Sequence, residues 1–215
     1  LSREYINQHD VFVLPLRLIY PEGEYRCGLD ISSDEVLRRM PHEIHSTSQP
    51  GPDDIDAVFD QMRARGIHHA VFVMISSGLS GTFNMARMYC QEHHDIEVEL
   101  FDSKYLSMGL GYFVMKAVEL RDGGLEFGKY ASALEAYRPQ VKGYFYVPTL
   151  DYLIKGGRIG LVAGTVGKLL NIKPIISCND EGKYYTLTKV PGARRAISRL
   201  CDLARDMMGS AECDV

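Results

Sequence analysis

Serine and threonine side chains gather in three loops, each beside the expected start of a helix. In chain order they are Thr47 with Ser48, then Ser76, Ser77 and Ser80, then Ser103 with Ser107. At the carboxyl ends of parallel strands, free N–H groups and the helix dipole favour an anion, and hydroxyls add donors without charge. Such loops can hold a carboxylate or a phosphate. Hydroxyls also cap helices routinely, which explains any single loop; three loops together favour a binding crevice.

Two charged residues are further candidates for a binding role. Arg158 follows two glycines, and its planar guanidinium suits a carboxylate or phosphate, although pairing with a neighbouring carboxylate explains it equally well. Asp102 ends an expected strand, where it can orient a hydroxyl or an amide of a loop. No two acidic residues form a convincing acid–base pair, so no catalytic residue is assigned.

Several familiar motifs are incomplete. Residues 162–168 resemble a P-loop, but Val162 stands where the first glycine belongs and Leu169 replaces the hydroxyl that binds magnesium. Residues 77–81 lack the first glycine of a nucleophile elbow, and residues 109–111 lack the third glycine of a dinucleotide motif. The 5 cysteines have no paired spacing, and neither they nor the 7 histidines predict a metal site. A reduced, cytoplasmic location is the expectation.

The elements that would position these loops alternate between strand and helix. Strands are expected at 11–20, 70–75 and 97–101, and helices near 32–40 and at 82–91, 107–121 and 127–137. A further helix is opened by Pro52 and ended by Gly66, and its apolar face is predicted to comprise Ile55, Val58, Phe59 and Met62. Residues 45–52 read as a loop. The helix at 107–121 is apolar around most of its circumference, which predicts that it is largely buried. This order predicts an α/β fold with a parallel, doubly wound sheet.

The pattern changes after Pro139. A strand is expected at 143–147, and residues 175–178 and 184–190 read as a β-hairpin around 179–182. The core side of a closing helix is predicted to comprise Ala193, Ala196, Ile197, Leu200, Leu203, Ala204 and Met207. We therefore expect two α/β lobes, 1–139 and 140–215.

Composition limits the partners. The 215 residues carry a formal net charge of -4, which argues against nucleic acid or an anionic membrane as the main partner. No apolar run approaches the roughly eighteen residues that a membrane span needs, so no integral membrane segment is expected. The chain begins without Met and ends without a capping signal, so both ends are expected to be cut.

Ordered segments along the chain carry a family resemblance. They are Thr47-Ser-Gln-Pro50, Ser76-Ser-Gly-Leu-Ser-Gly-Thr82, Asp102-Ser103 with Ser107-Met-Gly109, and Leu153-Ile-Lys-Gly-Gly-Arg-Ile159 with Leu169-Leu-Asn-Ile-Lys-Pro174. Together they resemble the DegV family of bacterial fatty-acid-binding proteins. The family begins with a strand and an Asp-Ser-Thr-like loop and continues past Val215 to a histidine that contacts the carboxylate. No histidine of this sequence matches that one.

The resemblance implies a two-lobed protein that holds one long-chain fatty acid between its lobes and needs no cofactor. By motif position, Thr47, Ser48, Ser77 and Ser80 would bind the carboxylate, with Ser76 a weaker candidate. A separate ATP-dependent fatty acid kinase would phosphorylate the bound lipid for phospholipid synthesis. Arg158 would lie on the surface that meets the kinase. The protein itself would then not be an enzyme.

Two other functions remain open from the residues. A small-molecule kinase or hydrolase of related architecture would need a nucleotide or metal site, which the motifs above do not supply. A lipid sensor that never meets a kinase would share the hydroxyl loops but would have no use for Arg158.

Overall fold

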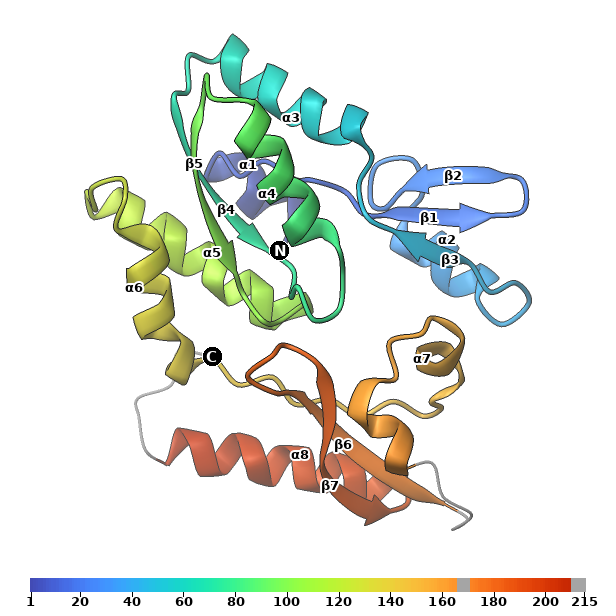
Figure 1. The fold of residues 1–215 in the computed structure, drawn as a ribbon. Helices are drawn as coiled ribbons and strands as arrows, with labels where there is room; N and C mark the ends of the chain where they lie inside the picture. Colours follow the sequence, from blue (N-terminus) through green and yellow to red (C-terminus); the bar gives the residue numbers. More distant parts are fainter. Residues whose placement is uncertain (166–170, 210–215) are drawn as a thin grey trace. The chain divides into compact units, whose positions relative to one another are not determined.

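A computed structural model describes residues 1–165 and 171–209. The chain divides into two compact units, Leu1–Val141 and Lys142–Val215, which are considered separately. Among the features predicted above, Lys168, Leu169 and Cys213 lie outside the described residues. The helices and strands of the first unit are α1 (Arg3–Gln8), β1 (Arg17–Tyr20), β2 (Gly23–Arg26), α2 (Ser33–Arg39), β3 (Ser46–Ser48), α3 (Pro52–Ala64), β4 (His69–Met74), α4 (Thr82–Glu92), β5 (Glu97–Asp102), α5 (Ser107–Asp122), α6 (Tyr130–Tyr137) and the 3-10 helix η1 (Arg138–Gln140) (Figure 1).

The centre of the first unit is the parallel strand pair β4–β5, in which Met74 lies opposite Asp102. Side chains alternate across these strands. Phe72 and Met74 pack with α3 and α4, whereas Val71 and Val73 pack with α5 and α6. Helices therefore cover both faces of the pair (Figure 1), which confirms the predicted parallel, doubly wound arrangement.

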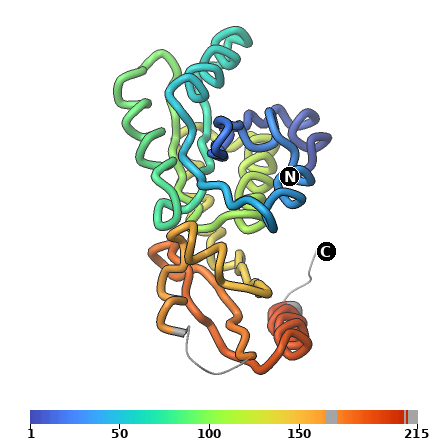
Figure 2. The backbone as a smooth tube through the Cα atoms, turned by 90° about the vertical axis from the view of Figure 1, so that its right-hand side faces the viewer, coloured from blue at the N-terminus to red at the C-terminus, as the bar shows by residue number. Residues whose placement is uncertain are grey.

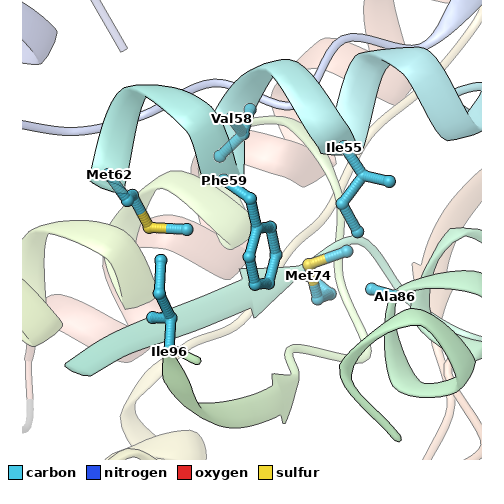
Figure 3. Packing of buried hydrophobic residues seen from close by; sticks show 7 residues of the cluster. All are labelled: Ile55, Val58, Phe59, Met62, Met74, Ala86 and Ile96. Carbon is cyan, nitrogen blue, oxygen red and sulfur yellow. The ribbon is translucent and has the colours of Figure 1, made fainter. Parts of the chain in front are cut away.

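Helix α3 supplies most of the core on one face of β4–β5. Pro52 occupies its first turn, where a missing N–H costs nothing, and its predicted apolar face is confirmed. Ile55 and Phe59 are fully buried, with Val58 and Met62 beside them (Figure 3). Burying each such side chain stabilises the fold by roughly 1.5–3 kcal/mol. The face that α3 covers is therefore held firmly, and with it the loop that leads into the helix.

A small antiparallel sheet of order β2-β1-β3 corrects two expectations. The predicted strand at 11–20 is confirmed only from Arg17 onward, because Pro15 has no N–H to donate to a ladder. Residues 45–52, expected to be a loop throughout, contain β3, which pairs Thr47 with Leu18. A strand of three residues is enough to pair with β1, because the burial of Leu18 and Tyr20 already holds β1 in place.

Helix α5 is less buried than its composition predicts. It packs on β4 and α6, and Gly111, Phe113 and Val118 are the buried residues of that face. The opposite face leaves Met108 48%, Tyr112 47% and Met115 37% exposed. The prediction of a largely buried helix is wrong because only one face of α5 meets the rest of the unit.

The second unit is built around an antiparallel hairpin. Its helices and strands are α7 (Asp151–Lys155), the 3-10 helix η2 (Gly160–Thr165), β6 (Ile172–Cys178), β7 (Tyr184–Pro191) and α8 (Ala193–Met208). The predicted hairpin is confirmed, and α8 lies against both of its strands, seen close to end-on in Figure 2. The strand expected at 143–147 is reduced to one bridge between Phe145 and Ile176.

The predicted core side of the closing helix is only partly right. Ala196 is buried and Leu200 and Leu203 are half-buried, but Ala193, Ile197, Ala204 and Met207 are exposed. The sheet beneath α8 has two strands, so it covers a narrower stripe of the helix than the full apolar pattern offers.

No helix among the described residues is long and apolar enough to cross a membrane. In the same part of the chain, no three His, Cys, Asp or Glu side chains gather as they would around a metal ion.

Candidate functional site

The loops after β4 and β5 lie side by side because their strands pair in parallel. The loop of residues 75–81 is tied to the loop of residues 103–106 by the Ser76 N–H, which donates to the Tyr105 carbonyl at 2.9 Å. Ser76 and Ser103 are fully buried, and their hydroxyls bond backbone groups of their own loops. These two serines therefore help to shape the loops.

Ser77 is held by a carboxylate and an ammonium group. Its N–H donates to Oδ1 of Asp102 at 3.1 Å, and its Oγ accepts a hydrogen bond from Nζ of Lys104 at 3.3 Å. The Lys104 ammonium also pairs with Oδ2 of Asp102 at 2.8 Å. The expected role of Asp102 in orienting a loop amide is thus seen directly.

The charge of Asp102 is stabilised in this position. Partial burial acts to raise the pKa of its carboxyl, but hydrogen bonds from Lys104 and Ser77 outweigh it and hold the pKa below the ordinary value of 3.8. Asp102 is therefore ionised at neutral pH, and the loops contain a fixed anion beside Ser77.

Ser80 takes part in the start of α4. Its Oγ lies 2.8 Å from Oγ1 of Thr82 and accepts the Thr82 N–H at 3.3 Å. Ser80 is half-buried, whereas Thr82 is only 3% exposed. When Thr82 donates to Ser80, the Ser80 hydroxyl proton remains available to a ligand, so capping and binding are compatible at this residue.

Thr47 and Ser48 belong to β3, and a neighbouring side chain links them to the loop after β4. Thr47 is exposed and Ser48 half-buried, with its hydroxyl donated to the Gln49 carbonyl at 3.1 Å. The Gln49 amide lies against Gly81, because a Cβ added to Gly81 would be 2.5 Å from Oε1 of Gln49. The first two of the three predicted hydroxyl loops therefore meet at residues directly next to Ser48 and Ser80.

An ion-pair network anchors the end of β3 to α3. Arg17 of β1 pairs with Asp53 and Asp54 at 2.7 Å each, and Asp54 is almost fully buried. The same Asp54 carboxylate accepts the Gly51 N–H at 2.8 Å. The charge-assisted bonds to the buried Asp54 fix the path of residues 48–52, and with it the position of Thr47 and Ser48.

Arg158 belongs to the second unit, whereas the hydroxyl loops belong to the first. It is exposed and follows α7, and its guanidinium donates to the Gly156 carbonyl at 2.6 Å. The structure thus brings together the loops of Ser48, Ser77 and Ser80 within the first unit. It gives Arg158 a separate local setting.

Two features of the site were not predicted from the residues. Lys104, with φ of 60°, and Ser107, with φ of 52°, adopt the left-handed conformation that non-glycine residues avoid. No residue-type signal at Lys104 announces that geometry, because Asn, Asp and Gly are the residues that favour it. Gln49 is part of the segment Thr47-Ser-Gln-Pro50, but the sequence does not predict that its side chain contacts Gly81 and so links two loops.

The arrangement offers several hydrogen-bond donors to an anion. Hydroxyls and one lysine supply donors, while the Asp102 carboxylate is already paired with that lysine. A carboxylate paired in this way is a poor general base, since its lowered pKa weakens its affinity for a proton. The donors of these loops suit a small negatively charged group.

Comparisons with known proteins agree with this picture. A family model described as "Uncharacterised protein, DegV family" matches residues 1–215. A DegV domain-containing protein of Clostridium acetobutylicum is 39% identical over 213 residues, covering 99% of this chain and 76% of that protein. A second one from the same organism is 40% identical over 215 residues, covering 100% of this chain and 77% of that protein.

Solved structures are similar over the same extent. A DegV fatty acid binding protein from Bacillus subtilis matches with a TM-score of 0.88 at 26% identity, covering 98% of this chain and 75% of that one. A stearic-acid-binding protein from Eubacterium ventriosum matches with a TM-score of 0.86 at 29% identity, covering 98% and 74%. The match over all residues and the identity to curated relatives show that this chain belongs to the DegV family.

Proposed function

We propose that this protein binds one long-chain fatty acid and holds its carboxylate with the hydroxyls of Thr47, Ser48, Ser77 and Ser80. The observation that carries the proposal is the meeting of the two hydroxyl loops at Gln49 and Gly81. Similar proteins of known structure are described as fatty-acid-binding, which supports this ligand over a phosphate. The lobe boundaries 1–139 and 140–215, which come from the change of pattern after Pro139, stay a prediction, as does the position of the acyl chain that the resemblance implies.

A protein container is physically reasonable for such a ligand. Removing each methylene group from water is worth about 0.8 kcal/mol, so a long acyl chain strongly favours an enclosed apolar site. Neutral hydroxyls can bind the head group without the desolvation cost of burying additional charges. The second part of the proposal is presentation of the carboxylate to a separate ATP-dependent fatty acid kinase in the cytoplasm, with Arg158 on the surface that meets it.

The ligand is tested by extracting the protein, purified from a bacterial host without added lipid, into organic solvent. Mass spectrometry should identify one fatty acid per chain, with the native mass giving the stoichiometry. A protein that is empty, and stays empty after incubation with several fatty acids, contradicts the proposal. Tight binding of ATP by the isolated protein would instead favour a small-molecule kinase.

The site is tested by the double variant Thr47→Ala/Ser80→Ala. We expect fatty acid affinity to fall roughly a hundredfold or more, because each of the two hydroxyls donates a hydrogen bond to a charged group. The matched control is Ser46→Ala/Ser132→Ala, which removes two exposed hydroxyls of the same unit. Thermal unfolding of both double variants measures any loss of stability that comes from removing the contact between Ser80 and Thr82. Unchanged affinity in the first variant would remove Thr47 and Ser80 from the site.

A further inference from the structure

The Lys104 side chain reaches its position through an unfavourable backbone conformation. Its φ of 60° is rare for lysine, and Oδ1 of Asp102 stabilises the turn by accepting the Lys104 N–H at 3.1 Å. The turn brings the ammonium group back to the end of β5, where Oδ2 of Asp102 lies 2.8 Å from it. A glycine or asparagine would adopt this turn more readily, so the turn itself does not call for a lysine.

The ammonium group has more donors than the contacts that hold it. An ammonium carries three protons, and the structure gives Nζ two acceptors among the described residues, Asp102 and Ser77. The Lys104 side chain is 30% exposed, whereas that of Asp102 is 13% exposed. The lysine is therefore the more exposed residue of the pair, and its ammonium group retains one N–H donor beside the Ser77 hydroxyl.

The surrounding charges make this lysine decisive for an anion. Asp102 is ionised and its Oδ1 accepts the Ser77 N–H, so without Lys104 a fixed negative charge would face any carboxylate held by Ser77. The next charged pair, Glu135 and Arg138, is joined at 2.7 Å, and Arg138 also bonds the Asp102 carbonyl. That arginine is committed to its own contacts.

We propose that Lys104 gives the site its preference for an ionised carboxylate over an uncharged head group. It does so by compensating Asp102 and by donating to the ligand next to Ser77. The inference rests on the proposed function, in which Ser77 contacts the head group. It assigns Lys104 to the ligand rather than to the stability of the loop.

The test compares palmitic acid with cetyl alcohol, which has the same chain but no charge. The variant Lys104→Asn removes the charge and keeps a residue type that tolerates the left-handed turn. We expect its affinity for palmitic acid to fall roughly ten- to a hundredfold, the effect of losing a charged hydrogen bond, with cetyl alcohol unchanged. Lys104→Arg should restore most of the preference for the acid. The matched control Lys129→Met breaks an exposed ion pair with Glu126 and should leave both ligands unaffected.

The possible failures are distinct. If the unaltered protein binds neither ligand, the proposed function fails and this inference fails with it. If it binds both, but Lys104→Asn weakens them equally or not at all, Lys104 has a structural role and only this inference is overturned. Lys104→Gly also fits the turn and lacks the charge, so its ratio of palmitic acid affinity to cetyl alcohol affinity must equal that of Lys104→Asn. A different ratio also overturns the inference.

Discussion

Individual side chains near the candidate site differ in how far the fold already uses them. Ser76 and Ser103 are fully buried, and their hydroxyls form hydrogen bonds with backbone groups of their own loops. Ser77 accepts a hydrogen bond from Lys104, which leaves its hydroxyl proton available as a donor. Ser80 accepts the Thr82 N–H, and its hydroxyl proton is available when the Thr82 hydroxyl is the donor of the contact between them. By this measure a binding role is most compatible with the Ser77 and Ser80 hydroxyls.

His45 precedes β3 directly and is the residue through which pH can act on this strand. Its Nδ1 is buried without a hydrogen-bond partner among the described residues, and its ring lies 5.2 Å from that of Tyr20. Burial, and then the charge of Arg39, lowers the pKa of His45 below its ordinary value of 6.5. The folded protein therefore keeps His45 neutral at a pH where the unfolded chain binds a proton.

That difference gives stability a defined pH dependence. Because the unfolded state binds more protons just below pH 6.5, the free energy of unfolding should decrease as the pH falls through this region. Urea unfolding at about pH 7.5 and about pH 5.5 should show the decrease, and His45→Gln should make it smaller. The exposed His42 provides the control His42→Gln, which should keep the full dependence. An equal decrease of the free energy of unfolding in the unaltered protein, His45→Gln and His42→Gln would contradict the role of His45.

At the scale of elements, the sequence predicts what local periodicity determines. Helix α3 and the β6–β7 hairpin follow from apolar spacing and turn residues, and both are confirmed. The short strand β3 carries only Ser and Thr, so nothing in its side chains distinguishes it from a loop until β1 supplies a partner. Helix α5 is apolar on faces that the first unit leaves open, so composition alone overestimates its burial.

The candidate site divides in the same way. Hydroxyls beside helix starts can be read from the sequence, because the residue types are informative there. The Lys104 turn and the contact between Gln49 and Gly81 depend on backbone angles and on two loops meeting, which no local pattern encodes. Sequence therefore identified the loops, and the structure identified how they are held.

Gly160 provides a test of how the second unit is held together. Its φ is +54°, and an added Cβ would lie 2.7 Å from the Tyr184 carbonyl oxygen of β7, a backbone atom that cannot move aside easily. Gly160→Ala should destabilise this unit by roughly 2–4 kcal/mol, combining the left-handed strain with overpacking. Hydrogen exchange should then become faster in β6 and β7 but not in β4 and β5. Gly164→Ala, in the same 3-10 helix with open space around it, should have little effect; equal effects of the two changes would contradict the close contact.

For the whole molecule, the two units separate the tasks that the proposed function requires. The hydroxyl loops, Asp102 and Lys104 lie in the first unit, whereas Arg158 lies in the second. The net charge of -4 leaves no general basic surface, so an anionic partner group must be met by particular cations. Arg158 is exposed, and its guanidinium can bind a phosphoryl group by two parallel hydrogen bonds.

This separation predicts that lipid binding and phosphoryl transfer can be uncoupled. Arg158→Ala should lower the rate of acyl-phosphate formation by a fatty acid kinase about tenfold or more, the cost of one lost charge-assisted contact. The affinity for fatty acid, measured on the same preparation, should not change. Arg158→Lys should recover only part of the rate, because an ammonium cannot make the paired contact. Arg195→Ala removes another exposed arginine of the second unit and should leave both quantities unchanged. An unchanged rate in Arg158→Ala would exclude this residue from the kinase-facing surface, and a parallel loss of lipid affinity would assign it to the ligand instead.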